Sequence, residues 1–151
     1  MAHKRMFSLD IVGSDAFLDM PQSSQLLYFH LGMSADDDGF VANSKRIARM
    51  IGCGDDDIKI LIAKRFILKF DSGIVVIKHW KINNYIPKDR YHETVYLKEK
   101  HQLALKNNGS YTDRIQDVYK LDTETRIEKN RINNINKIQK RKLEIINKKS
   151  I

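Results

Sequence analysis

The sequence predicts a mainly helical α+β domain with a C-terminal extension, and three observations lead to this fold class. Two short helical segments flank a tight, glycine-containing turn. A β-hairpin signal follows the second of these segments directly. The aromatic residues then give way to a lysine- and asparagine-rich tail, which lacks the large side chains of a core. Two helices across a turn with a hairpin behind them indicate a winged helix-turn-helix.

The first helix is expected after Pro21, because proline fits the first turn of a helix. Its apolar side recurs at three- and four-residue spacing, as a buried face requires, in Leu26, Leu27, Phe29, His30 and Met33. Asp36-Asp37-Asp38-Gly39 ends this helix. These carboxylates suit weak binding of a hard cation, but the further ligands of an EF-hand are missing, which favours a solvated turn.

Two shorter helices are expected on either side of the turn Gly52-Cys53-Gly54, after a small strand at Phe40-Val41. Asn43 or Ser44 caps the earlier helix. Its inward residues are expected to be Ile47, Ala48, Met50 and Ile51. The aspartates at 55–57 suit the start of the later helix, because capping and the helix dipole both favour carboxylates there. The inner face of that helix is Ile58, Leu61 and Ile62.

A β-hairpin is expected immediately after Arg65. Residues 66–70 and 74–80 are rich in β-branched and aromatic side chains, and the turn sequence Asp71-Ser72-Gly73 joins them. The expected order is therefore helix, short strand, helix, tight turn, helix and hairpin. This order is what predicts the helix-turn-helix with its wing.

Charge and composition change towards the C-terminus. Residues 1–111 hold 16 Lys and Arg against 13 Asp and Glu, whereas residues 112–151 hold 11 against 6. All six Phe, the single Trp, both Pro and all seven Gly lie in the first segment. Because Asn107-Asn108-Gly109-Ser110 is polar and turn-forming, we place the boundary there. The expected organisation is a winged-helix DNA-binding domain over residues 1–106 and a basic extension over 107–151.

The extension keeps a partial helical pattern. Its apolar positions fall on one seam, Val118, Leu121, Ile132, Ile135 and Ile146. Polar residues interrupt the seam too often for a coiled coil. A marginal, solvated or disordered helix is expected, with a partner-dependent helix and a nucleic-acid-binding arm as the alternatives.

Several classes of protein are excluded by composition and motifs. The longest apolar run, Ile74 to Ile77, is far shorter than a membrane span. A single cysteine, Cys53, excludes disulfides within the chain and cysteine-based zinc sites. The sequence has no glycine-rich phosphate loop and no H-E-x-x-H motif, and its five histidines show no ligand spacing. No catalytic residue, metal or cofactor is therefore expected, and neither is enzymatic activity.

The net charge of +8 indicates a polyanionic partner or an anionic membrane surface. On the second helix, Lys45, Arg46 and Arg49 fall within about 100° of arc. The first helix of a helix-turn-helix crosses the DNA backbone, where cations contact phosphates. The third helix fits a groove less well, because the aspartates at 55–57 would be repelled by phosphates. Its outward Ile60 and Ala63 suit thymine methyl groups or a protein partner.

The segment from Lys81 to Tyr91 interleaves cations, amides and aromatic residues. This mixture suits backbone contacts with base stacking. The alternative, equally favoured by the sequence, is a structured loop in which Tyr85 and Ile86 cover the hairpin. The helices, the hairpin and this segment together give the expected DNA contacts, which are Lys45, Arg46, Arg49, Lys59, Lys64, Lys69, Lys78, His79, Lys81, Lys88 and Arg90.

Short motifs follow one another between residues 3 and 100. They are Arg5-Met6-Phe7-Ser8, Asp15-Ala16-Phe17-Leu18, Leu27-Tyr28-Phe29-His30-Leu31, Ala35-Asp36-Asp37-Asp38-Gly39-Phe40, Arg49-Met50-Ile51-Gly52, Ile67-Leu68, Ile77-Lys78-His79-Trp80, Asn83-Asn84-Tyr85-Ile86 and Asp89-Arg90-Tyr91. In this order they resemble the N-terminal domain of phage replisome organisers, the DnaD-like replication-initiation proteins of phages and prophages of Gram-positive bacteria. The resemblance implies a winged helix that binds replication-origin DNA and helps to bring in the host's helicase-loading machinery. Members of the family commonly carry a second domain after a linker, a place that the basic extension takes here.

The expected function is that of a non-enzymatic DNA-binding protein of phage origin, cytoplasmic in the bacterial host and acting in replication initiation. Duplex origin DNA is the expected partner. Host helicase-loading proteins and a homodimer are further candidates, and no membrane is expected. Two alternatives stay open: a transcriptional regulator on the same fold, and a protein-interaction or inhibitor module in which Ile60, Ala63 and the extension dock a partner.

Overall fold

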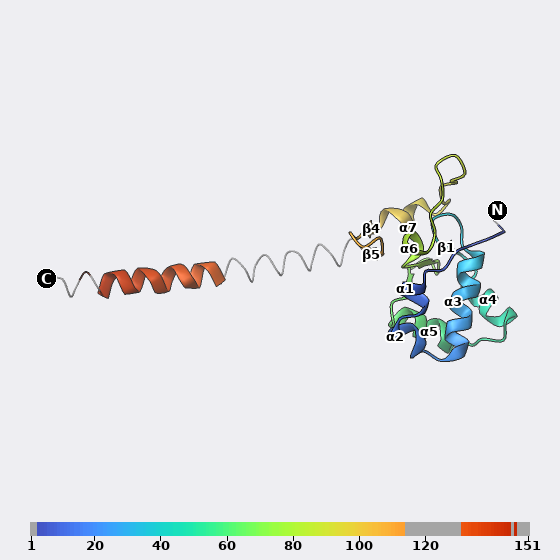
Figure 1. Cartoon of the computed structure of the whole chain (residues 1–151), viewed down its shortest axis with the longest axis horizontal. Coiled ribbons are helices and arrows are strands. Elements are labelled where there is room, and N and C mark those ends of the chain that lie inside the picture. The colour runs from blue at the N-terminus through green and yellow to red at the C-terminus, as the bar shows by residue number, and fades with distance from the viewer. Residues whose placement is uncertain (1–2, 114–130, 146, 148–151) are drawn as a thin grey trace. The chain divides into compact units, whose positions relative to one another are not determined.

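The structure, a computed structural model, describes residues 3–113, 131–145 and 147. It divides into two units, Met1–Asp113 and Arg114–Ile151. The first unit is an α+β fold, and most of its elements are labelled in Figure 1. In chain order they are α1 (Leu9–Val12), α2 (Asp15–Leu18), α3 (Gln22–Ser34), β1 (Phe40–Val41), α4 (Ser44–Met50), α5 (Asp55–Ala63), β2 (Ile67–Lys69), β3 (Val75–Ile77), α6 (Trp80–Asn83), α7 (Leu97–His101), β4 (Leu103–Leu105) and β5 (Tyr111–Asp113).

Helix α3 begins after Pro21, as expected, but its buried face differs from the predicted one. Leu27, Tyr28 and Leu31 are buried, together with Ser24, whereas Leu26, His30 and Met33 are exposed. The buried set keeps the helical spacing, one position away from the predicted stripe. Asn83 Nδ2 donates to Tyr28 Oη at 2.8 Å, which satisfies the hydroxyl inside the core.

Aromatic side chains hold the helices against the sheet. The ring of Phe17 from α2 lies edge-on to Tyr28 at 5.3 Å and to Phe66 at 5.6 Å. Edge-to-face packing of this kind is favourable beyond the area that it buries. Phe66 directly precedes β2, so the cluster ties the N-terminal helices to the start of the hairpin.

Helices α4 and α5 lie on either side of the expected turn. In α4, Ile47 and Ala48 are buried, but the inward placement of Met50 was wrong, because its side chain is 75% exposed. Met50 closes the last turn of this seven-residue helix and points away from the core. Asn43 occupies the N-cap position of α4 without a side-chain capping bond. In α5, Ile58 and Leu61 are buried as predicted.

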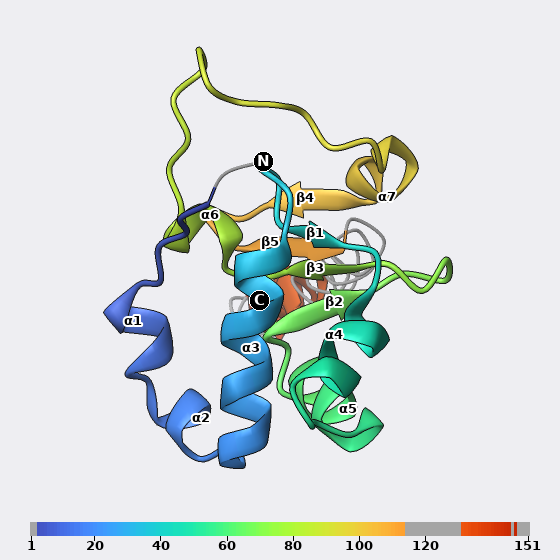
Figure 2. The same cartoon turned by 90° about the vertical axis from the view of Figure 1, so that its right-hand side faces the viewer.

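The predicted small strand and hairpin form one antiparallel sheet in the order β1-β3-β2. Phe40 pairs with Val76, and Ile67 pairs with Ile77. All three residues of β3 are buried, so both faces of this central strand are covered. Figure 2 shows α3 across one face of the sheet and the β2–β3 turn projecting on the same side as α4.

A second hairpin, β4–β5, was not predicted. Asn107-Asn108-Gly109-Ser110 is its turn rather than a domain boundary, and Gly109 adopts a φ of 90° there. The Tyr111 amide donates to the Lys78 carbonyl at 2.8 Å, and Leu103 and Tyr111 are part of the core. The first unit therefore reaches Asp113, seven residues beyond the expected end at residue 106.

The second unit contains a helix over residues 131–145, whose side chains are exposed. Ile132 and Ile135 of the predicted apolar seam lie on this helix. Val118, Leu121 and Ile146 lie outside the described residues. Among the helices of the described part, none has the length and apolar character to cross a membrane.

Candidate nucleic-acid interface

Lysines from two distant segments meet at the turn end of the β2–β3 hairpin. A small cavity of about 250 Å³ is lined by Lys45 at the start of α4 and by Lys69 at the end of β2. Asn43, Ser44 and Gly73 line the same cavity, so the hairpin turn lies beside the N-terminal turn of α4. The fold thus brings together two predicted DNA contacts that are 24 residues apart in the sequence.

The cations of α4 share its exposed side. Lys45, Arg46 and Arg49 are exposed, whereas Ile47 and Ala48 are buried on the opposite side of the helix. The ion pairs found in the described part of the chain involve Arg5, Lys81, His92 and Lys100, and none of the α4 cations. Three uncompensated charges on one helix face form a surface suited to phosphates.

Helix α5 is less acidic on its surface than its sequence indicates. Asp57 is buried and accepts hydrogen bonds from Ser23 Oγ at 2.6 Å and Ser24 Oγ at 2.8 Å. Its other oxygen accepts from the Gly54 amide at 3.1 Å. The hydrogen bond from Ser23 above all lowers the pKa of Asp57, against the opposing effect of burial. Of the three aspartates, two remain exposed, Asp55 and Asp56.

The outward side of α5 carries two of the predicted cations, Lys59 and Lys64, which are both exposed. Ala63 is exposed beside Lys64, but Ile60 is half-buried. The apolar patch expected from Ile60 and Ala63 is therefore smaller than the sequence indicates. This leaves α5 with a mixed surface, acidic at its N-terminal end and basic further along.

Lys78 and His79, beyond β3, are half-buried. Burial, and then the charge of Lys78, lower the pKa of His79 to about 4, so its ring is neutral at pH 7. That ring packs against Phe66 at a centroid distance of 5.7 Å. His79 is thus a packing residue without positive charge at neutral pH. Burial, followed by the charges of Arg65 and Lys106, lowers the pKa of Lys78.

Arg65 and Lys106 are cations that sequence reasoning did not include among the DNA contacts. Arg65 stands between α5 and β2, and Lys106 begins the unpredicted β4–β5 turn. The available signal for Arg65 was its position directly before the predicted hairpin. For Lys106 the sequence gives no local signal, because its neighbourhood depends on the pairing of β5 with β4.

The remaining predicted cations lie beyond the hairpin. Lys81 Nζ lies 3.6 Å from Asp38 Oδ1 and 5.6 Å from the centre of the Tyr91 ring, so its charge is compensated within the protein. Lys88 and Arg90 are exposed on the following loop. The ion pairs of the described residues include neither of them.

The acidic turn at Asp36–Asp38 was predicted to be solvated, and this was wrong. Asp38 is fully buried, and Asp36 and Asp37 are half-buried. Asp36 Oδ1 accepts from the amides of Asp38 and Phe40, while Asp38 Oδ2 accepts from the Thr94 amide at 2.8 Å. The reason is tertiary: donors more than 50 residues away surround the turn. Its carboxylates are occupied by protein groups.

The loop between α6 and α7 is fastened to this turn. Tyr91 Oη lies 2.7 Å from both Asp38 carboxylate oxygens, and Thr94 Oγ1 donates to Asp36. Asn83 Oδ1 accepts from the Ser8 amide, and Asn84 Oδ1 accepts from the Met6 amide. The two amide side chains of this segment therefore hold the N-terminal segment around Met6 and Ser8 in place.

The same segment leaves one aromatic ring available for contact. The side chain of Tyr85 is 80% exposed, so it does not cover the hairpin as one interpretation of the sequence had it. Ile86 is half-buried. Tyr85 is thus available for stacking or for a protein contact.

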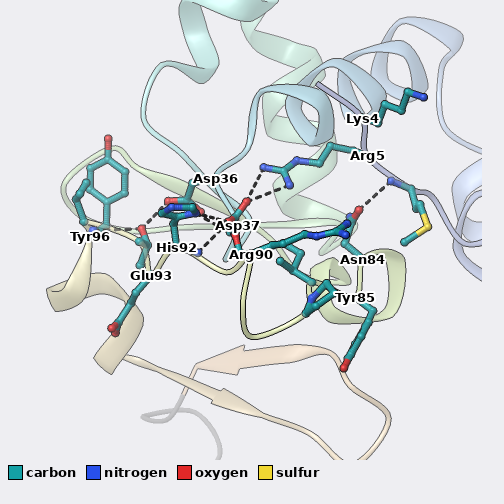
Figure 3. A pocket seen from close by; sticks show the side chains of 15 residues that line it. Lys4, Arg5, Asp36, Asp37, Asn84, Tyr85, Arg90, His92, Glu93 and Tyr96 are labelled. Atoms are coloured by element: carbon teal, nitrogen blue, oxygen red, sulfur yellow. Dashed lines mark hydrogen bonds and ion pairs between the residues drawn. The ribbon is translucent and has the colours of Figure 1, made fainter. Parts of the chain in front are cut away.

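A pocket larger than the cavity at the basic surface lies beside this loop. It has a volume of about 890 Å³ and is bordered by Met6, Ile86, Pro87 and Val95 among others. Figure 3 shows Arg5 extended toward Asp37, to which Nη1 donates at 3.2 Å, while Tyr85 and Glu93 point away from the acidic turn. Because the carboxylates are engaged by the protein, the pocket offers a mainly apolar surface.

The described residues offer no ready site for a metal and no activated thiol. Within residues 3–113 and 131–145, no group of three or more His, Cys, Asp or Glu side chains is arranged to hold a metal ion. Cys53 is buried, with Sγ 3.4 Å from the Ser23 carbonyl. Burial, and then the charge of Asp57, raise the pKa of its thiol.

Comparison of the chain with models of protein families, with curated proteins and with solved structures finds no match. Any function must therefore be argued from the residues and the geometry of this chain.

Proposed function

We propose that the chain is a winged-helix protein that binds duplex DNA through α4 and the β2–β3 hairpin. The main support is that Lys45 of α4 and Lys69 of β2 line one cavity. Arg46 and Arg49 are exposed on α4 as well. The element order supports it, because α3, β1, α4, α5 and the β2–β3 hairpin follow one another as in a helix-turn-helix with a wing. In this arrangement α4 lies along the phosphate backbone and the hairpin turn is the wing.

The charges of α5 decide how that helix approaches DNA. Asp55 and Asp56 at its N-terminal end repel phosphates, whereas Lys59 and Lys64 attract them. We therefore place the middle and C-terminal part of α5 against DNA, and its first turn away from it. Six to eight neutralised phosphates give a slope of log affinity against log salt of roughly −5 to −7.

The biological role that we propose is replication initiation in a phage or prophage, with the bound DNA lying in a replication origin. The support is the ordered series of motifs that resembles the replisome organisers. Arg5 and Asp37, which belong to two of those motifs, are ion-paired at 3.2 Å. Asn83 and Asn84 of a third motif hold the segment around Met6. The motifs are thus neighbours in the fold.

The test is a titration of labelled duplex at several salt concentrations with the full chain and with the double variant Arg46→Gln, Arg49→Gln. We expect the variant to lose about tenfold or more in affinity and its salt slope to fall by roughly 2, because each phosphate contact contributes about 0.9. The matched control is Lys4→Gln, Lys98→Gln, which removes two exposed charges outside this surface.

An absence of salt-dependent binding of the full chain of 151 residues to any duplex would contradict the proposal. Equal losses in the variant and in the control would contradict the placement of the interface on α4. Preference for repeats of a replication origin over an operator beside a promoter separates initiation from transcriptional regulation.

A protein-docking function is the second candidate, and the pocket beside the α6–α7 loop favours it. The side chains of Tyr85 and Val95 at its border are 80% and 83% exposed. Exposed apolar groups gathered around a concave surface are typical of protein contacts. The variant Tyr85→Ala, Val95→Ser should then abolish partner binding and leave duplex binding unchanged, whereas a DNA-stacking role for Tyr85 predicts weaker duplex binding.

A further inference from the structure

Three cations from distant segments converge at the end of the β2–β3 hairpin opposite its turn. Ile67 pairs with Ile77, and the Lys78 amide donates to the Phe66 carbonyl at 3.1 Å, so Phe66, the neighbour of Arg65, stands opposite Lys78. On the other side of Lys78, its carbonyl accepts from the Tyr111 amide at 2.8 Å. Tyr111 pairs with Leu105, the neighbour of Lys106. These backbone contacts bring Arg65, Lys78 and Lys106 into one neighbourhood, and the charges of Arg65 and Lys106 both act on Lys78.

This cluster lacks an anionic partner among the described residues. Each ion pair found there involves Arg5, Lys81, His92 or Lys100. Lys78 is half-buried, and the charges of Arg65 and Lys106 lower its pKa further after the effect of burial. Like charges held together without a counter-ion destabilise a fold. A bound phosphate group removes that cost.

Position 65 has an arginine in a backbone conformation that usually belongs to glycine. Arg65 has a φ of 61°, in the left-handed region that favours glycine. The Phe66 amide donates to the Leu61 carbonyl at 2.9 Å and the Arg65 amide to the Ile62 carbonyl at 3.0 Å, the two bonds of a Schellman motif. Glycine is the usual residue at this position of the motif. An arginine there indicates that its charge has a use.

We propose that Arg65, Lys78 and Lys106 form a second phosphate-binding site, which holds the backbone of the same duplex that α4 and the β2–β3 turn contact. This inference rests on the proposed function. Arg65 and Lys69 are four positions apart in mostly extended chain, roughly 13 Å. With one phosphate per 3.4 Å of axis on each strand, this separation covers about four phosphates. One duplex therefore spans both ends of the hairpin.

The variant Arg65→Gly, Lys106→Gln tests this site. Glycine suits the left-handed conformation and Lys106 is exposed, so the melting temperature should equal or exceed that of the unmodified chain. In a titration of labelled duplex at several salt concentrations we expect about a tenfold loss of affinity and a salt slope that falls by roughly 2. Arg65→Lys, which keeps the charge, should retain the full slope.

The comparison variants separate the two proposals. If the full chain shows no salt-dependent duplex binding, the proposed function is wrong and the second site with it. If Arg46→Gln, Arg49→Gln weakens binding but Arg65→Gly, Lys106→Gln does not, the second site is wrong and the proposed function stands. Duplex affinity could fall equally in the variant Arg65→Gly, Lys106→Gln and in the control Lys4→Gln, Lys98→Gln. The loss would then reflect net charge alone, and the second site would be wrong.

Discussion

Asp38 is the residue on which the packing of the α6–α7 loop converges. Its side chain is fully buried, with the Tyr91 hydroxyl at 2.7 Å and the Thr94 amide at 2.8 Å from its oxygens. Lys81 Nζ lies at 3.6 Å and Lys100 Nζ at 3.5 Å. A buried carboxylate is tolerated only when it is hydrogen-bonded and its charge is compensated, and both conditions hold here.

Asp38→Asn should therefore lower the free energy of unfolding by about 3 kcal/mol. The amide group presents a donor where Tyr91 and the Thr94 amide also donate, and it leaves two lysines without their anion. This loss is at the lower end of the range for breaking a buried ion pair. Lys81 and Lys100, with side-chain exposures of 39% and 31%, remain partly solvated without their anion. Urea denaturation measures the loss. Asp89→Asn, on an exposed side chain of the same loop, should change stability by less than about 0.5 kcal/mol.

If both substitutions had equal effects, the buried position of Asp38 would be wrong.

The neighbouring Gly39 explains how the chain enters β1 after this aspartate. It has a φ of 90°, and a Cβ atom added to it would lie 2.6 Å from Cγ of Trp80. Glycine at position 39 is thus required by the packing of Trp80, whose Nε1 donates to the Asp37 carbonyl at 2.8 Å.

Helix α5 is fixed to α3 through the hydrogen bonds of Asp57. Asp57→Ala should lower the free energy of unfolding by about 2–3 kcal/mol, because the capping bond to the Gly54 amide is lost and the buried Ser24 hydroxyl is left without its acceptor. Asp56→Ala, in the same helical turn but exposed, should cost about 0.5 kcal/mol or less.

The pH dependence of stability provides a second measurement for Asp57. Because its pKa is lower in the folded protein than the ordinary 3.8, its contribution is present above pH 3.8 and is lost as the pH falls below that value. Urea titrations between pH 5 and pH 2 should show a flatter acid limb for Asp57→Ala than for Asp56→Ala. Parallel acid limbs would contradict the role given to Asp57.

The elements that the sequence predicted correctly are those with a local signal. Pro21, the Gly52–Gly54 turn and Asp71-Ser72-Gly73 mark α3, the α4–α5 turn and the hairpin without help from the rest of the chain. Strands β4 and β5 have three residues each, too few for a periodicity to be detected, and they form because Tyr111 bonds to Lys78 and Asp38.

The same distinction applies to the candidate site. The exposed cations of α4 follow from helical periodicity, so they were predictable from residues 44–50 alone. The burial of Asp38, the neutral ring of His79 and the approach of Lys106 to Lys78 depend on contacts between residues far apart in sequence. Local patterns carry no information about such contacts, and this is where the interpretation of single residues failed.

Charge is divided unevenly between the two units. Residues 1–113 hold 16 Lys and Arg against 14 Asp and Glu, whereas residues 114–151 hold 11 against 5. Most of the net charge of +8 therefore lies outside the unit that carries α4 and the two hairpins. A strongly basic segment adds sequence-independent affinity for any polyanion, so binding specificity must be measured without it.

The boundary between the units decides which shortened chain is suitable for that measurement. Residues 1–113 should unfold cooperatively, because they retain Tyr111, which is buried and whose hydroxyl donates to the Asp38 carbonyl at 2.9 Å. Residues 1–106 lose β5 and should be less stable by about 3–5 kcal/mol, the cost of removing a large buried aromatic side chain.

Urea denaturation of the two shortened chains, followed by the fluorescence of Trp80, measures the difference. Equal midpoints would contradict the inclusion of the β4–β5 hairpin in the first unit. If residues 1–113 bind origin duplex more tightly than random duplex, recognition belongs to the first unit and the basic segment only adds affinity. If only the full chain binds, and without preference for sequence, the basic segment supplies the contact with DNA and the first unit becomes the better candidate for protein docking.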